Sequence, residues 1–327
     1  MGGNRVAAEY RDGADRAHPD AAAWLAAQSG LALELAQAAQ ALGRLDEAIA
    51  ALEPAARAGA LRRLALSEIE AMLWAQGVPL RREEVGRDLM EARAGADLEA
   101  MRLARWGIRR LEGQGDPGRL RGFLGLHHTE LPGLDESLSP RPTGADFDAA
   151  AAEFAAGHAL LAGLAPLARA PAARSLWRRA GLSPPERLTE SAVWTARDMA
   201  LGCDALCFVP MGRHGRAVWV DGGPPGERLR RHLAAARAGL VEARQELARL
   251  DAWRVRAMAA AARIKGDNAA RAIAALAAQP LLSAAMLQAE TGISRDTAER
   301  MLARLRALGL VREITGGRRF RLWVAAL

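Results

Sequence analysis

Apolar residues recur at spacings of three and four along most of the chain, which is the pattern of helices that bury one face. This pattern predicts successive helices over residues 20–113, with Asp20 placed to cap the first of them. Residues 113–146 are rich in Gly and Pro and predict a long loop with one short helix inside it. The expected fold class is therefore mainly α, with a flexible arm over residues 1–19 and an all-helical bundle body over residues 20–265.

One long helix is predicted over residues 226–264, directly after Pro224 and Pro225. Its apolar positions alternate spacings of four and three for about three heptads, as they do in a coiled coil. These positions are Leu229, Leu233, Ala236, Leu240, Ala243, Leu247 and Leu250. Two interpretations of this seam stay open, because the helix either packs on its own domain or forms the contact of a homodimer.

Residues 205–221, which precede the long helix, hold two apolar runs around a Gly-rich turn. A β-hairpin and a buried loop both fit this pattern. Cys203 and Cys207 stand four apart at the start of this segment, a spacing that can place both on one helix face. Zinc needs about four ligands and no second pair lies nearby, so we expect two buried structural thiols and no metal.

The pattern changes again over residues 266–327, where three short helices are expected. Ser283 suits the N-cap of the second helix and Ser294 that of the third. Gly292, between them, suits a turn position with positive φ. Two short strands around residues 316–317, a Gly-Gly pair, then predict a β-hairpin.

This order of helix, helix, turn, helix and hairpin resembles a winged helix-turn-helix over about residues 268–325, carried by the run ETGISRDTAERMLARLRALGLVREI. The third helix, residues 294–308, has a single apolar stripe. The stripe consists of Ala298, Met301, Leu302, Leu305 and Leu308. Gln288 stands where this motif usually has Ala at a close helix crossing, so a looser crossing is expected.

The positive charge of the chain is concentrated at its C-terminal end. The net charge is +7, and all basic residues except Lys265 are arginines. With such a biased composition, the number of arginines is weaker evidence for phosphate binding than their location. From Arg254 onward, 13 basic residues stand against 5 acidic ones, a net +8, which leaves the preceding part at −1. A basic module on a near-neutral body indicates an anionic partner.

The resemblance implies that the helix 294–308 enters the major groove of double-stranded DNA, with its first turns nearest the base edges. Arg295 and Arg300 suit bidentate contacts with guanine. Asp296 and Thr297 suit cytosine or the methyl group of thymine.

Four further arginines are expected to contact the DNA backbone or the minor groove rather than the bases. They are Arg304 on the third helix and Arg318, Arg319 and Arg321 on the wing. The alternative is a module that serves only as a protein–protein platform, with these arginines as a solvated face.

The body carries a second resemblance. Ser67-Glu68-Ile69-Glu70, a helix over residues 83–92 and Asp97-Leu98-Glu99-Ala100 resemble the start of Fic-type proteins. In that family the residue at the position of Glu70 bears on an active-site arginine and restrains nucleotide use.

The catalytic stretch of that family, a His with a downstream acidic residue and a Gly-Asn-Gly-Arg run, is absent. Neither His127-His128 nor residues 211–215 supply it. We therefore expect Glu70 to be a solvated or ion-paired residue and the chain not to be an enzyme. The alternative function is that of a catalytically inactive Fic-like helical protein, whose C-terminal module binds another protein.

Both ends together resemble an uncharacterised family of bacterial proteins, often plasmid-borne in rhizobia, that join a helical body to a C-terminal helix-turn-helix. The run Pro280-Leu281-Leu282-Ser283-Ala284 and the run from Arg312 to Trp323 carry this resemblance. It implies a DNA-binding role without an established activity.

The composition favours a cytoplasmic setting, since no signal peptide and no uncharged apolar stretch of 18 residues is recognisable. Residues 222–226 are Gly-rich but lack the Lys-Ser/Thr of a phosphate-binding loop, so no cofactor is expected. The sequence thus predicts a homodimeric transcriptional regulator that binds duplex DNA in a sequence-specific way, without membrane contact. It names no ligand for the body.

Overall fold

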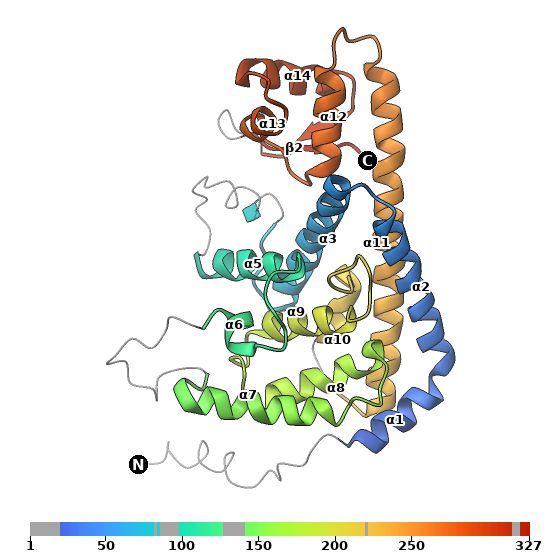
Figure 1. The fold of residues 1–327 in the computed structure, drawn as a ribbon, viewed down its shortest axis with the longest axis vertical. Coiled ribbons are helices and arrows are strands. Elements are labelled where there is room, and N and C mark those ends of the chain that lie inside the picture. The colour runs from blue at the N-terminus through green and yellow to red at the C-terminus, as the bar shows by residue number, and fades with distance from the viewer. Residues whose placement is uncertain (1–19, 82–83, 86–97, 127–140, 220–221, 316–320) are drawn as a thin grey trace.

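The computed structural model describes residues 20–81, 84–85, 98–126, 141–219, 222–315 and 321–327. It is mainly α-helical, as predicted, with a helical body below and a small C-terminal module above it in Figure 1. The body helices are α1 (Ala21–Gly30), α2 (Ala32–Ala50), α3 (Pro54–Ala75), α5 (Leu98–Leu111), α6 (Leu120–Leu124), α7 (Gly144–Ala159), α8 (Pro166–Arg179), α9 (Leu188–Met199), the 3-10 helix η2 (Gly212–Gly215) and α10 (Arg216–Trp219). The helix α11 (Pro225–Ala261) leads into α12 (Asn268–Ala278), α13 (Ala284–Thr291), α14 (Arg295–Ala307), β1 (Val311–Glu313) and β2 (Trp323–Ala325).

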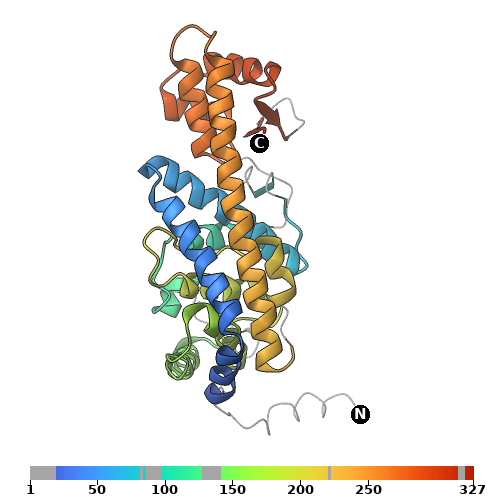
Figure 2. The same ribbon diagram turned by 90° about the vertical axis from the view of Figure 1, so that its right-hand side faces the viewer.

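The helix α11 runs along the body and continues into the module, beside α2 over its lower part (Figure 2). At 1.5 Å per residue its 37 residues span about 55 Å. Leu229, Leu233 and Leu240 of the predicted seam are at most 1% exposed and belong to the core of the body. The seam therefore packs on its own chain, and the homodimer interpretation of these positions is wrong.

The predicted loop 113–146 contains α6 and the start of α7, and its residues 127–140 lie outside the described part of the chain. The arm 1–19 also lies outside it, as does most of the helix expected over residues 83–92. Asp20 caps α1 as predicted, since its Oδ1 accepts from the backbone N–H of Ala23 at 2.9 Å. None of the described helices is long and apolar enough to cross a membrane.

Residues 205–219 form no strand, and so the β-hairpin interpretation is wrong there. They run as an irregular segment into η2 and α10. The buried carboxylate of Glu68, on α3, holds this segment because its Oε2 accepts from the backbone N–H groups of Met211 (2.9 Å) and Gly212 (2.5 Å). The two apolar runs thus pack into the core of the body, and the side chain of Glu68 holds them in place. The local sequence of the segment gives no sign of this contact, because Glu68 lies on a distant helix.

Cys203 and Cys207 lie in the irregular segment that follows α9, so the prediction of a shared helix face is wrong. Both thiols are free and half-buried rather than buried. Burial raises the pKa of Cys203 to about 11, and the charges of Asp46 and Asp204 add to the effect. Among the described residues, no group of three or more His, Cys, Asp or Glu side chains is arranged to hold a metal ion.

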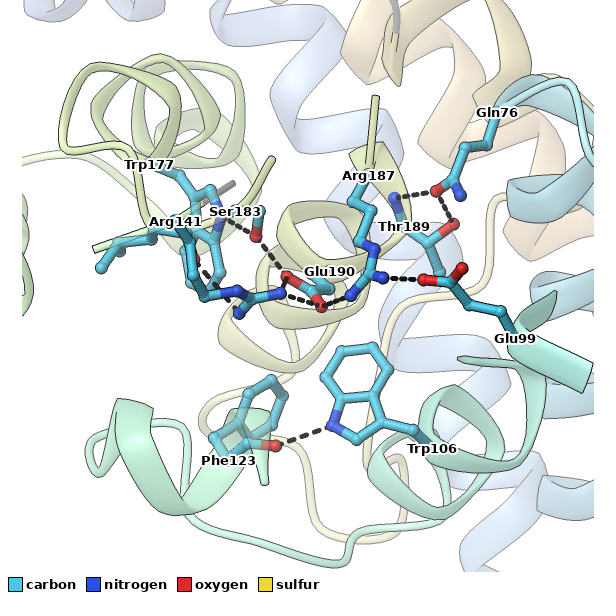
Figure 3. Close-up of polar contacts among 11 residues, drawn as sticks. Gln76, Glu99, Trp106, Phe123, Arg141, Trp177, Ser183, Arg187, Thr189 and Glu190 are labelled. Atoms are coloured by element: carbon cyan, nitrogen blue, oxygen red, sulfur yellow. Dashed lines mark hydrogen bonds and ion pairs between the residues drawn. The ribbon is translucent and has the colours of Figure 1, made fainter. Parts of the chain in front are cut away.

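A buried polar network ties the loops of the body together (Figure 3). Glu190 on α9 is 5% exposed, and its two oxygens lie 2.8 and 3.0 Å from Nη2 of Arg141. Ser183 also donates to this carboxylate, and Arg187 lies 3.7 Å from it. Arg187 also pairs with Glu99, so two carboxylates balance two guanidinium groups, and we interpret the cluster as structural.

The C-terminal module has a hydrophobic core of its own, which includes the last part of α11. Trp253 of α11 is 1% exposed, and its Nε1 donates to the backbone oxygen of Leu310 at 2.8 Å. The strands β1 and β2 pair antiparallel, with Arg312 opposite Val324. Leu282, just before α13, forms a further antiparallel bridge with Trp323. This small sheet fixes the start of α13 against the wing.

Candidate nucleic-acid interface

The turn between α13 and α14 has the predicted geometry. Ser283 caps α13 by accepting from the N–H of Met286 at 3.1 Å, and Ser294 caps α14 by accepting from the N–H of Thr297 at 3.2 Å. Gly292 has φ of +71°, a left-handed conformation that favours glycine. Ile293, directly after it, is buried in the module core.

Gln288 lies on α13, four residues before Gly292. Its side chain is exposed, whereas the neighbouring Leu287 is fully buried in the core. The looser crossing stays a prediction, and the exposure of Gln288 shows only that its side chain reaches solvent.

The first two turns of α14 present a polar, exposed face. Arg295 and Arg300 are exposed, and each pairs with an acid one turn away on the same helix. Arg295 Nε lies 3.3 Å from Glu299 Oε1, and Arg300 Nη2 lies 2.9 Å from Asp296 Oδ2. Exposed pairs of this kind contribute about 0.3–0.5 kcal/mol each to the stability of the helix. A ligand that binds the arginines more strongly can therefore take the place of Glu299 and Asp296.

The stripe opposite this face is buried, which fixes the direction in which the arginines point. Ala298, Met301, Leu302 and Leu305 are all at most 9% exposed. Leu308, the last residue of the predicted stripe, is 45% exposed, because α14 ends at Ala307. The helix is thus half in the core and half available to a ligand.

Arg304 extends the exposed face by one more turn and forms no ion pair with the residues that the structure describes. On the wing, Arg321 is half-exposed, and its Nε lies 3.9 Å from Glu313 Oε1. Arg306 lies 3.8 Å from the other oxygen of Glu313. Arg318 and Arg319, and the Gly-Gly pair at 316–317, lie outside the described residues.

Three of the positions that resemble Fic-type proteins, Ser67, Glu68 and Glu70, line a separate cavity of about 120 Å³ between α3, η2 and α11. Glu242 of α11 also lines it, and its Oε2 lies 2.8 Å from Nε2 of His214. Burial raises the pKa of Glu68 to about 7, against the opposite effect of the two backbone N–H donors. The sequence pattern singled out Glu70 and not Glu68. The only sequence signal for Glu68 is that it stands next to Ile69, on the side of α3 that is buried.

Residues 266–319 match the MarR family. Among curated proteins no match was found. A solved structure of a Fic family protein from Desulfovibrio desulfuricans G20 is similar over 90% of this chain and 95% of that one, with 15% sequence identity and a TM-score of 0.49. The family match agrees with the helix-turn-helix predicted from the sequence, so the C-terminal segment is similar to the MarR family.

Proposed function

We propose that the chain is a transcriptional regulator that binds double-stranded DNA in a sequence-specific way, reading the major groove with α14. The observation that carries this proposal is the exposed, arginine-bearing face of α14 in a segment that matches the MarR family. The net +8 charge from Arg254 onward supports it, since the rest of the chain is near neutral.

In this proposal Arg295 and Arg300 exchange their intrahelical partners for guanine bases. A bidentate contact of arginine with guanine contributes about 1–3 kcal/mol of discrimination, more than the exposed pair that it replaces. Asp296, released from Arg300, and Thr297 then face neighbouring base edges.

Arg304, Arg321 and the wing residues Arg318 and Arg319 are proposed to contact phosphates or the minor groove. Such contacts set the position of the module and its dependence on salt, without reading sequence. We also propose a homodimer whose contact does not use the seam of α11. Dimers of this class read two half-sites, which predicts inverted repeats among the selected sequences.

Selection of duplexes from a random pool with the full-length chain, followed by binding measurements in a salt series, tests the proposal. We expect an enriched motif, tighter binding to it than to scrambled duplex, and a linear fall of log K with log salt. Light scattering on the same sample measures the oligomeric state. Equal, weak binding to every duplex would refute sequence-specific recognition and favour the protein–protein platform.

A further inference from the structure

The helix α11 carries a second regular stripe on the side that faces away from the core of the body. Like the buried seam, this stripe alternates spacings of four and three, so its positions share one face of the helix. The outer face of α11 consists of Ala234, Ala238, Val241, Gln245, Ala248, Ala252, Val255 and Ala259. All but the half-buried Ala238 are exposed, and in Figure 2 the helix lies in front of the rest of the chain. An exposed stripe in which seven of eight side chains are apolar lacks a partner within its own chain.

A groove of about 450 Å³ lies between α2 and the lower half of this outer face. Its floor is apolar, with Leu240 fully buried and Ala41 half-buried. Its polar rim contains three guanidinium groups, those of Arg44, Arg237 and Arg244, and no carboxylate among the described lining residues. The groove therefore suits a partner that brings an apolar side chain to the floor and a negative charge to the rim.

The outer face is complementary to itself when two copies of α11 lie antiparallel about a two-fold axis between residues 246 and 247. In this register Val241 lies opposite Ala252 of the second copy, and Val255 lies opposite Ala238 of the second copy. Each large side chain thus meets a small one, which fills the space between two helices without a clash. A parallel pair in register would place valine against valine and alanine against alanine.

The charges beside the outer face favour the same arrangement. Flanking positions set the orientation of a helix pair, and here Arg244 lies opposite Asp251 of the second copy and Glu242 lies opposite Arg249. The two-fold axis repeats both contacts. Glu242 and Asp251 already form pairs in their own chain, but all these side chains are at least 32% exposed, and such pairs are weak enough to be shared. A parallel pair would instead place Arg244 against Arg249, two like charges, although two of its other flanking contacts are attractive.

The antiparallel register also fills the groove. Met258, which is 42% exposed, lies opposite Arg237 of the other copy, beside the apolar floor. Asp251 brings its carboxylate to the three arginines of the rim. An exposed methionine and a basic groove on one chain thus match each other on two.

We propose that the outer face of α11 is the contact between two copies of this chain, with the helices antiparallel and Met258 of each copy over the groove of the other. The proposal names the contact of the homodimer and rests on that part of the proposed function, whereas it does not depend on DNA binding. Trp253 of the same helix belongs to the core of the C-terminal module. The contact therefore holds the module of one copy against the body of the other.

Light scattering of the full-length chain over a dilution series, in the absence of DNA, tests this contact with two matched variants. Ala252→Arg puts a long charged side chain opposite Val241 and is expected to raise the dissociation constant of the dimer at least about tenfold. Ala260→Arg makes the same change at an exposed position of α11 outside the outer face, and is expected to alter the constant by less than about twofold. A chain that is monomeric at every concentration, or equal constants for the two variants, would overturn the proposal.

A charge exchange tests the register. Arg244→Glu places two acids opposite each other and is expected to weaken the dimer about fivefold. The further change Asp251→Arg in the same chain recreates an attractive pair and is expected to restore the dimer. A double variant as weak as the single one would overturn this register.

Crosslinking with a short bis-maleimide tests the direction of the helices. Val241→Cys and Ala252→Cys chains, mixed, are expected to form a crosslinked dimer, whereas each variant alone stays at the level of the natural chain with Cys203 and Cys207. In the antiparallel pair, equal positions lie about 16 Å apart along the axis. Crosslinking of each variant with itself would overturn the antiparallel arrangement. A dimer that persists in Ala252→Arg would overturn this contact and leave the homodimer of the proposed function standing, and DNA binding is separate from all these outcomes.

Discussion

The side chain of Arg63 on α3 donates from Nη2 to the backbone oxygen of Gln279, at 3.2 Å, directly after the last turn of α12. The same nitrogen lies 3.4 Å from the oxygen of Leu276. Carbonyl groups at a helix C-terminus lack intrahelical partners and carry partial negative charge, so a buried guanidinium satisfies and stabilises them. Nearby, Gly59 leaves no room for a Cβ against the backbone of Ala278. The module is therefore docked on the body by specific backbone contacts.

Arg63→Met is expected to destabilise the fold by about 2–3 kcal/mol, because it leaves buried carbonyl oxygens without their charged donor. Urea unfolding followed by circular dichroism measures this loss. Arg62→Met is the control: Arg62 is 42% exposed, and its contacts with Glu112 and with Gln279 Oε1 are together expected to contribute about 1 kcal/mol. Equal losses in the two variants would contradict the role assigned to Arg63.

Glu68 is expected to lower the stability of the chain between pH 5 and 8, against the opposite effect of His232, whose pKa burial holds well below its usual value. Burial raises the pKa of this carboxyl from 4.5 to about 7, so the folded chain holds a proton that the unfolded chain has already lost in this range. The contribution of Glu68 is fully present below the unfolded pKa and is lost as the pH rises through the folded pKa. The raised pKa corresponds to a contribution of Glu68 to the free energy of unfolding that is about 3 kcal/mol smaller above the folded pKa than below the unfolded pKa.

Glu68→Gln removes the titration and keeps an oxygen for the N–H groups of Met211 and Gly212. Relative to its value at pH 5, the free energy of unfolding at pH 8, measured in urea, is therefore expected to be about 3 kcal/mol higher in this variant than in the natural chain. Ser67→Ala alters the same cavity without a titratable group and is expected to keep the natural pH dependence. A Glu68→Gln variant with an unchanged pH dependence would show that Glu68 is ionised throughout.

Glu190→Ala is expected to cost about 3–5 kcal/mol of stability, because it leaves the 10% exposed side chain of Arg141 charged and without its main partner. Asp148→Ala provides the comparison. Asp148 pairs with Arg121 at a similar distance, 2.9 Å, but is 67% exposed, and so we expect a loss below about 1 kcal/mol. Thermal or urea unfolding of both variants measures the difference, and similar losses would argue against a structural role for the Glu190 network.

The elements with strong local signals could be predicted from the sequence. Ser283 and Ser294 cap their helices with their side chains, Gly292 takes the positive φ that the absence of a Cβ permits, and the apolar stripe of α14 is buried through Leu305. The cap and turn residues act on their nearest neighbours in the chain, and therefore one sequence is enough to find them.

Features that depend on contacts distant in sequence could not be predicted. The seam of α11 looks the same whether it faces α2 or a second copy, since both require the same apolar spacing. The roles of Glu68 and Arg63 depend on segments far away in the sequence, such as Met211, 143 residues from Glu68, and Gln279, 216 residues from Arg63. The composition gives no indication of the role of Arg63 either, because nearly every basic residue of the chain is an arginine.

Two substitutions on α14 separate base reading from phosphate contact. Arg300→Ala removes a proposed guanine contact and is expected to weaken binding to the selected motif by about 1–3 kcal/mol and to relax the preference at one base pair. Arg304→Ala removes a proposed phosphate contact, so it should weaken all duplexes alike and reduce the salt slope by about one. Anisotropy titrations of both variants with motif and single-mismatch duplexes measure these effects. Because both side chains are exposed on the same helix, a general loss of folding would affect the two variants equally, and identical specificity profiles would refute the division between them.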